Sequence, residues 1–106
     1  MPKFLVQGSF SAEGVKGLMK EGGTSRRETI SKMLTDLGGS LDAFYFGFGG
    51  TDVWVLADVP DNVTAAALGM TISATGAVST NTVVLLTPEE IDAATKTSVG
   101  YRPPGQ

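Results

Sequence analysis

Two side chains in this sequence have the type and position to support acid–base chemistry. Asp52 lies directly after the turn Gly49-Gly50-Thr51, and Tyr45 lies in the apolar run before that turn. A carboxylate at a pocket mouth can accept a proton or anchor a ligand, and a phenol can donate or relay a proton. Alternatively, Asp52 forms an Asx-type turn that stabilises the hairpin. We name Asp52 and Tyr45 as candidate catalytic residues.

Three further residues are candidates for binding a ligand. Trp54 faces Tyr45 in the predicted hairpin, so the two rings could line a slot for a flat aromatic molecule. The alternative is a cross-strand aromatic pair buried in a dimer interface. Arg26 and Arg27 fall in the first turn of a predicted helix, where the helix dipole disfavours cations unless an anion binds there. The alternative for the arginines is a solvated surface.

The composition excludes several classes of function. The 106-residue chain contains no histidine and no cysteine. Catalysis by a Ser-His-Asp triad or a thiolate and metal sites built from His or Cys are therefore excluded. No cluster of oxygen ligands replaces them, so we expect no metal and no cofactor. The net charge of −3 gives no electrostatic reason to bind nucleic acid or an anionic membrane.

The length and hydropathy predict one domain over residues 1–106, with an extended tail at 98–106. No apolar run reaches the ~18 residues that a membrane-spanning helix needs. The first residues, Met1–Gly8, lack the long apolar region of a signal peptide. We therefore expect no membrane partner and assign a cytoplasmic location by default.

The first half of the chain predicts a strand followed by two helices. The alternation over residues 3–10 indicates a strand, after which Ser11 could cap a short helix. The main helix is predicted over residues 26–37, with Ser25 and Glu28 at the spacing of a capping box. Its apolar residues recur with helical spacing and predict one buried stripe. This stripe consists of Ile30, Met33, Leu34 and Leu37.

The second half predicts a hairpin, a helix, a strand and a short capped helix. Glycines at 49 and 50 suit a tight turn between two strands. The predicted elements are strands at 41–48 and 53–59, a helix through about Thr75, a strand at 77–86 and a helix from Thr87 to about Thr97. The order β-α-β-β-α-β predicts an α+β, ferredoxin-like sandwich whose four-stranded antiparallel sheet carries both main helices on one face.

The hairpin also predicts which side chains share a face of the sheet. The face assigned to the helices comprises Phe44, Phe46, Phe48, Val53, Val55, Ala57 and Val59. The opposite face comprises Leu41, Ala43, Tyr45, Asp52, Trp54 and Leu56. This second face is too apolar to be left in water, because two helices cover only one side of the sheet. We predict a homodimer through this open face, although a ligand or a different protein would satisfy the same argument.

Several short runs, in order along nearly the whole chain, resemble the GYD domain family. They are Pro2-Lys3-Phe4-Leu5, Glu13-Gly14-Val15-Lys16-Gly17, Glu21-Gly22-Gly23, Ser25-Arg26-Arg27, Leu37-Gly38-Gly39, Ala43-Phe44-Tyr45-Phe46, Leu86-Thr87-Pro88-Glu89-Glu90 and Tyr101-Arg102-Pro103-Pro104-Gly105. The Gly-Tyr-Asp motif of the family reads Gly50-Thr51-Asp52 here, so its tyrosine is missing. The resemblance implies a dimeric α/β barrel, in which two such sheets pack face to face, and it implies no activity.

Two hypotheses for the function follow. In the first, a homodimer binds or converts a small, partly aromatic or anionic molecule in a pocket between sheet and helices. If it is an enzyme, fold analogy suggests proton abstraction, isomerisation or cofactor-less oxygenation. In the second, the domain is non-catalytic and serves self-assembly or protein interaction. A filled core with no cavity beside Tyr45, Asp52 and Trp54 would favour the second hypothesis.

Overall fold

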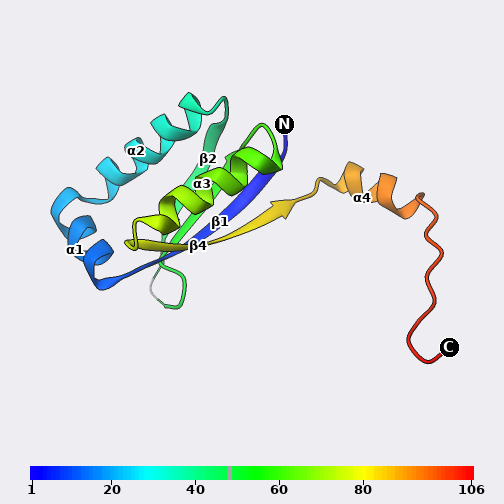
Figure 1. Ribbon diagram of the computed structural model, residues 1–106. Helices are drawn as coiled ribbons and strands as arrows, with labels where there is room; N and C mark the ends of the chain where they lie inside the picture. Colours follow the sequence, from blue (N-terminus) through cyan, green and yellow to red (C-terminus); the bar gives the residue numbers. More distant parts are fainter. Residues whose placement is uncertain (48) are drawn as a thin grey trace.

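The computed structural model describes residues 1–47 and 49–106 and has the predicted α+β, ferredoxin-like architecture. Its elements are β1 (Lys3–Phe10), α1 (Ala12–Glu21), α2 (Gly23–Asp36), β2 (Ser40–Phe46), β3 (Val53–Asp58), α3 (Asn62–Ala74), β4 (Val78–Leu85) and α4 (Pro88–Thr95). The four strands are antiparallel in the order β2-β3-β1-β4. Helices α2 and α3 lie on one face of this sheet (Figure 1).

The core lies between this face and the two helices. In the centre of the sheet, Phe4 of β1 pairs with Ala57 of β3, and both side chains are almost fully buried. The buried cluster comprises Phe4, Ile30, Leu34, Val53, Val55, Ala57, Val59, Ala65 and Leu68. The strand residues of this cluster point to the helix face because successive residues of a strand alternate between the two faces of the sheet.

The start of α2 differs from the prediction. Ser11 caps α1 as predicted and accepts a hydrogen bond from the Gly14 N–H at 3.1 Å. However, α2 begins at Gly23, and its cap is Gly22, with φ of 89° and no side-chain hydrogen bond. The predicted capping box of Ser25 and Glu28 is therefore wrong. Gly22 turns the chain directly from one helix into the next, so Ser25 already lies inside the first turn.

A register shift in β2 corrects one part of the predicted face assignment. The shift lies between Leu41 and Ala43, and it pairs Leu41 with the buried Ala57. Leu41 therefore packs against the core and does not lie on the open face as predicted. A β-bulge has this effect because one extra residue inverts the alternation of side chains beyond it.

The loop of the hairpin is longer than predicted. Strand β2 ends at Phe46, and the Gly47 N–H donates to the Asp52 carbonyl at 2.8 Å. The predicted extension of the strand to Phe48, and the face of that side chain, lie outside the described residues. Phe44 pairs with Val55 and Phe46 with Val53, which confirms the predicted facing of these residues.

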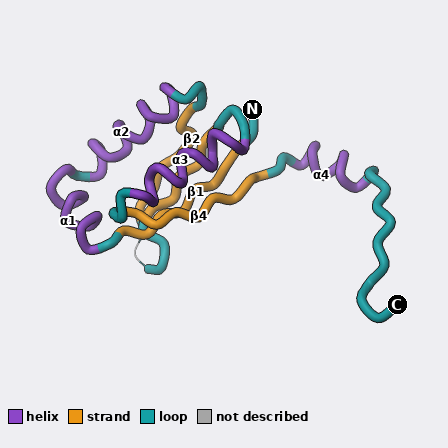
Figure 2. The backbone as a smooth tube through the Cα atoms, in the orientation of Figure 1, coloured by secondary structure: helices purple, strands orange, loops and turns teal. Residues whose placement is uncertain are grey.

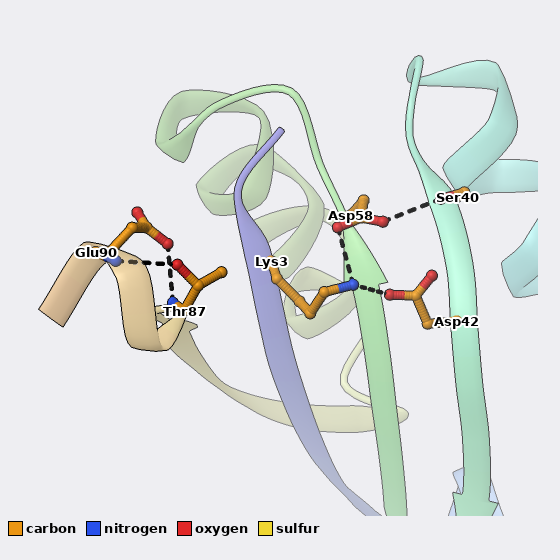
Figure 3. A network of polar contacts seen from close by, with 6 residues as sticks. All are labelled: Lys3, Ser40, Asp42, Asp58, Thr87 and Glu90. Atoms are coloured by element: carbon orange, nitrogen blue, oxygen red, sulfur yellow. Dashed lines mark hydrogen bonds and ion pairs between the residues drawn. The ribbon is translucent and has the colours of Figure 1, made fainter. Parts of the chain in front are cut away.

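The second half of the chain follows the predicted order. Asp61 caps α3 by accepting a hydrogen bond from the Thr64 N–H at 2.7 Å, which lowers the pKa of its carboxyl group. Thr87 caps α4 as predicted, and it forms a capping box with Glu90 (Figure 3). Helix α4 and the tail after it stretch away from the rest of the molecule (Figure 2). Among the described residues, no helix combines the length and apolarity that crossing a membrane requires.

Candidate functional site

An apolar cavity of about 50 Å³ lies between the sheet and helices α2 and α3. Its walls come from all four strands and both helices. They include Val6, Phe10, Ile30, Met33, Leu34, Phe44, Val55, Leu68, Ile72, Val78 and Thr80. Such a space holds atoms of an apolar group better than water, because water needs several polar partners.

Arg26 is the one charged residue among those that line the cavity in the described part of the chain. It lies in the first turn of α2 and is partly buried. Among the described residues, its guanidinium group has no ion pair within 4.0 Å and no hydrogen bond. An arginine carries five N–H donors and stays charged at every physiological pH. Its donors are therefore available to an anion.

A second hollow, of about 140 Å³, adjoins the cavity beside α1. The two spaces share Phe10, Arg26 and Val78, so Arg26 lies at the boundary between them. The outer hollow carries Glu13 and Glu21 in its wall and is thus more polar than the inner cavity. We call it the vestibule. Arg26 therefore borders both the apolar cavity, also called the inner chamber, and the more polar vestibule.

Arg27 has a different environment, although it is the next residue of the helix. Its side chain is exposed, and it lines neither the cavity nor the vestibule. Adjacent residues of a helix point about 100° apart, so they cannot face the same space. The structure therefore separates the two arginines that the sequence places side by side.

Asp52 forms hydrogen bonds with the backbone of the neighbouring strand β1. Its carboxylate accepts a hydrogen bond from the Phe10 N–H at 2.8 Å, and its own N–H donates to the Gly8 carbonyl at 2.9 Å. These bonds continue the pairing of β1 with β3 beyond the last ladder pair, Gly8 and Val53. Asp52 is not among the residues that line the cavity or the vestibule.

Tyr45 and Trp54 are direct cross-strand partners on β2 and β3. Both belong to the open face of the sheet, because Phe44 and Val55 beside them belong to the helix face. Tyr45 is 70% exposed and Trp54 is 39% exposed. The structure brings these two candidates together but places the sheet between them and Arg26.

The open face is apolar in its middle and charged at one end. One row across the sheet consists of Ala43, Leu56, Leu5 and Val83. At the end of the face, the Lys3 ammonium contacts Asp42 and lies 3.1 Å from Asp58 Oδ1 (Figure 3). Hydrogen bonds to Asp42 and then Asp58 raise the pKa of Lys3. This salt bridge cluster bounds the apolar area.

Sequence reasoning singled out Arg26 but missed the residues around it. Thr80 lines the cavity, and its position two residues after the buried Val78 on β4 could have indicated this side of the strand. No pattern in the sequence indicated that Glu13 and Glu21 would line the vestibule. They approach Arg26 because α1 folds back beside α2 at Gly22, which is a tertiary arrangement.

Comparison with known proteins identifies a family for this fold. A family model described as GYD domain matches residues 4–95, which is most of the chain. No curated protein and no solved structure matches the sequence.

Proposed function

This chain belongs to the GYD domain family, and we propose that it binds a small, partly aromatic carboxylate between its sheet and helices, as a homodimer. The observation that carries the proposal is Arg26, a partly buried cation without an ion-pair partner among the described residues, beside an otherwise apolar cavity. The carboxylate would lie on the guanidinium group, and the apolar part of the ligand would enter the inner chamber.

The chemistry of the site favours a carboxylate with a compact apolar body. Arginine matches the two oxygens of a carboxylate with two parallel hydrogen bonds. The positive end of the α2 dipole lies at the same place and favours an anion. The inner chamber of about 50 Å³ is small, so the ligand must be compact and must occupy the vestibule as well.

The proposal concerns binding and assigns no reaction. Among the described residues, the wall of the inner cavity carries no carboxylate. Arginine is a poor proton acceptor, because its pKa lies far above neutral pH. Asp52, the candidate base, is hydrogen-bonded to the backbone at Phe10.

Arg26→Gln is expected to weaken the binding of small aromatic carboxylates about tenfold or more, because a hydrogen bond to a charged group contributes about 1.5–3 kcal/mol. The measurement is a titration of ¹⁵N-labelled protein with benzoate and phenylacetate, followed by amide chemical shifts. In the wild-type protein, the shifts should concentrate at residues of the cavity wall such as Ile30 and Phe44.

Arg27→Gln is the matched control, because it removes the same charge from the same helix turn at an exposed side chain. Arg27→Gln should leave the affinity for benzoate and phenylacetate unchanged. Benzamide, which is similar in size and uncharged, should bind the wild-type protein more weakly than benzoate does. Equal losses in both arginine variants would show that only the general charge of the surface attracts the anion, and would contradict the proposed site.

The homodimer in this proposal forms through the open face of the sheet. Its support is the apolar area around Tyr45, Trp54 and Leu56, which no element of the described chain covers. Burying such an area releases water from apolar surface and stabilises association. A second copy presents the same area, and a two-fold axis pairs each patch with itself. Tyr45 and Trp54 then act as interface residues.

Leu56→Lys is expected to convert the dimer to a monomer, because it places a charge in the centre of the apolar row. The measurement is the molar mass from light scattering after size-exclusion chromatography. Val63→Lys is the control, since Val63 is 79% exposed on α3, away from this face. If Leu56→Lys remains dimeric, the two copies do not pair through the open face.

A further inference from the structure

The C-terminal segment from Leu86 to Gln106, called the arm, forms no hydrogen bond and no ion pair with the rest of the chain that the structure describes. All of its residues are exposed, and it points away from the sheet and the other helices (Figure 1). The radius of gyration is 16.9 Å, whereas a compact chain of this length would have about 13 Å. The longest dimension of 56 Å compares with 34 and 23 Å for the others. The arm accounts for this elongation.

Although detached, the arm contains a well-defined helix. Helix α4 has eight residues, a proline in its first turn and a complete capping box between Thr87 and Glu90. Helices shorter than about 12 residues are only marginally stable in water, even with good caps. Short helices in proteins are stabilised by packing an apolar side on another surface. Helix α4 therefore requires a surface that its own chain does not provide in this conformation.

The arm also carries apolar side chains that would form such a contact. Ile91 of α4, and Val99 and Tyr101 of the tail, are all exposed. Tyr101 combines a large apolar ring with a hydroxyl group, a composition that is frequent at the centre of interfaces. Pro103-Pro104 stiffens the end of the tail, so less conformational entropy is lost when it is ordered.

We propose that α4 and the tail of each copy pack on the second copy of this chain, beside the paired sheet faces. This inference rests on the proposed homodimer. The arm leaves β4 immediately after Leu85, which pairs with Lys3 at the rim of the open face. In a face-to-face dimer, the first surface beside this rim belongs to the partner. One two-fold-related copy thus covers both the open face and the arm, whereas a foreign partner would need two matching surfaces.

The absence of cysteine permits a direct test in the full-length protein. Ser98→Cys provides a single site for a nitroxide spin label in the tail. The labelled ¹⁴N protein is equilibrated with unlabelled ¹⁵N protein until the subunits exchange. We expect amide signals of the sheet and helices in the ¹⁵N copy to lose intensity, and to recover it when the nitroxide is reduced. Only contact between copies can produce this loss.

Two outcomes would overturn the inference while leaving the homodimer intact. If the label broadens signals only within its own chain, measured with labelled ¹⁵N protein diluted in ¹⁴N protein, the arm folds back on itself. If a dimer shows no broadening outside the arm, the arm is free. A monomeric mass in light scattering would instead show that the proposed homodimer fails, and the inference with it.

Paired variants of α4 provide a second measurement. Ile91→Asp should raise the dimer dissociation constant about tenfold or more, because it replaces a buried apolar contact by a charge. Ala93→Asp adds the same charge two residues along the helix, which is nearly the opposite side of α4. It should change the constant little. Equal effects of both variants would contradict specific packing of α4.

Discussion

Leu34→Ala is expected to lower the free energy of unfolding by about 2–5 kcal/mol. Leu34 is 1% exposed in α2 and lines the inner cavity. The substitution removes buried apolar surface, and it also enlarges a space that the neighbouring side chains already leave unfilled. Each additional cubic ångström of cavity costs about 24 cal/mol, so the loss should lie in the upper part of this range. Urea denaturation followed by circular dichroism measures it.

Leu37→Ala is the matched control, since Leu37 lies at the end of the same helix and is 40% exposed. Leu37→Ala should lower the free energy of unfolding clearly less than Leu34→Ala does. The cavity of Leu34→Ala should also bind benzene or toluene, because removing the Leu34 side chain adds space to the apolar cavity of about 50 Å³ that is already present. A small loss of stability together with no binding of these probes would mean that the helices collapse onto the sheet and that the cavity is not rigid.

Gly14→Ala is expected to destabilise the protein by about 1–3 kcal/mol, although alanine favours helix formation over glycine. A Cβ atom at Gly14 would lie 2.2 Å from the carbonyl oxygen of Ala77 and 3.1 Å from the ring of Phe10. The carbonyl also accepts the Ser11 N–H at 2.9 Å, so it is held in place. Helix α1 must therefore move away from the turn before β4, and the vestibule beside Arg26 should change shape.

Gly17→Ala lies in the same helix, one turn further along, and serves as the control. A Cβ atom there meets nothing within 4 Å, so the variant should gain about 0.5–1 kcal/mol from helix propensity. Opposite signs for the two substitutions, measured by urea denaturation, would confirm the close approach of α1 to Ala77. A stabilising effect of Gly14→Ala would show that this contact is absent in solution.

The candidate site was predictable only in part. The two adjacent arginines were recognisable as an anion-binding candidate, but their separation depends on how α2 rotates over the sheet. The inner cavity depends on the packing of Phe10, Phe44 and Leu68, which come from three distant segments. Side-chain volumes in a sequence do not reveal such a gap, because neighbouring residues can shift to fill it.

The hydrogen-bond partner of Asp52 was likewise not predictable from the sequence. A carboxylate after a glycine-rich turn was compatible with a catalytic base or with a turn-stabilising residue. Its hydrogen bond to the Phe10 N–H joins residues that are distant in sequence. This bond exists because β1 lies beside β3, so the choice of partner is a property of the sheet order.

The order of the elements, the ferredoxin-like topology and most of the core face were predictable from the amino-acid sequence. Those features follow from local patterns: the alternation in β1 and β3, the helical spacing in α2 and the capping box at Thr87. The cap of α2 at Gly22, the bulge that moves Leu41 to the core, and the cavity at Arg26 became apparent only from the three-dimensional structure. These depend on contacts between distant segments, whose geometry no local pattern contains.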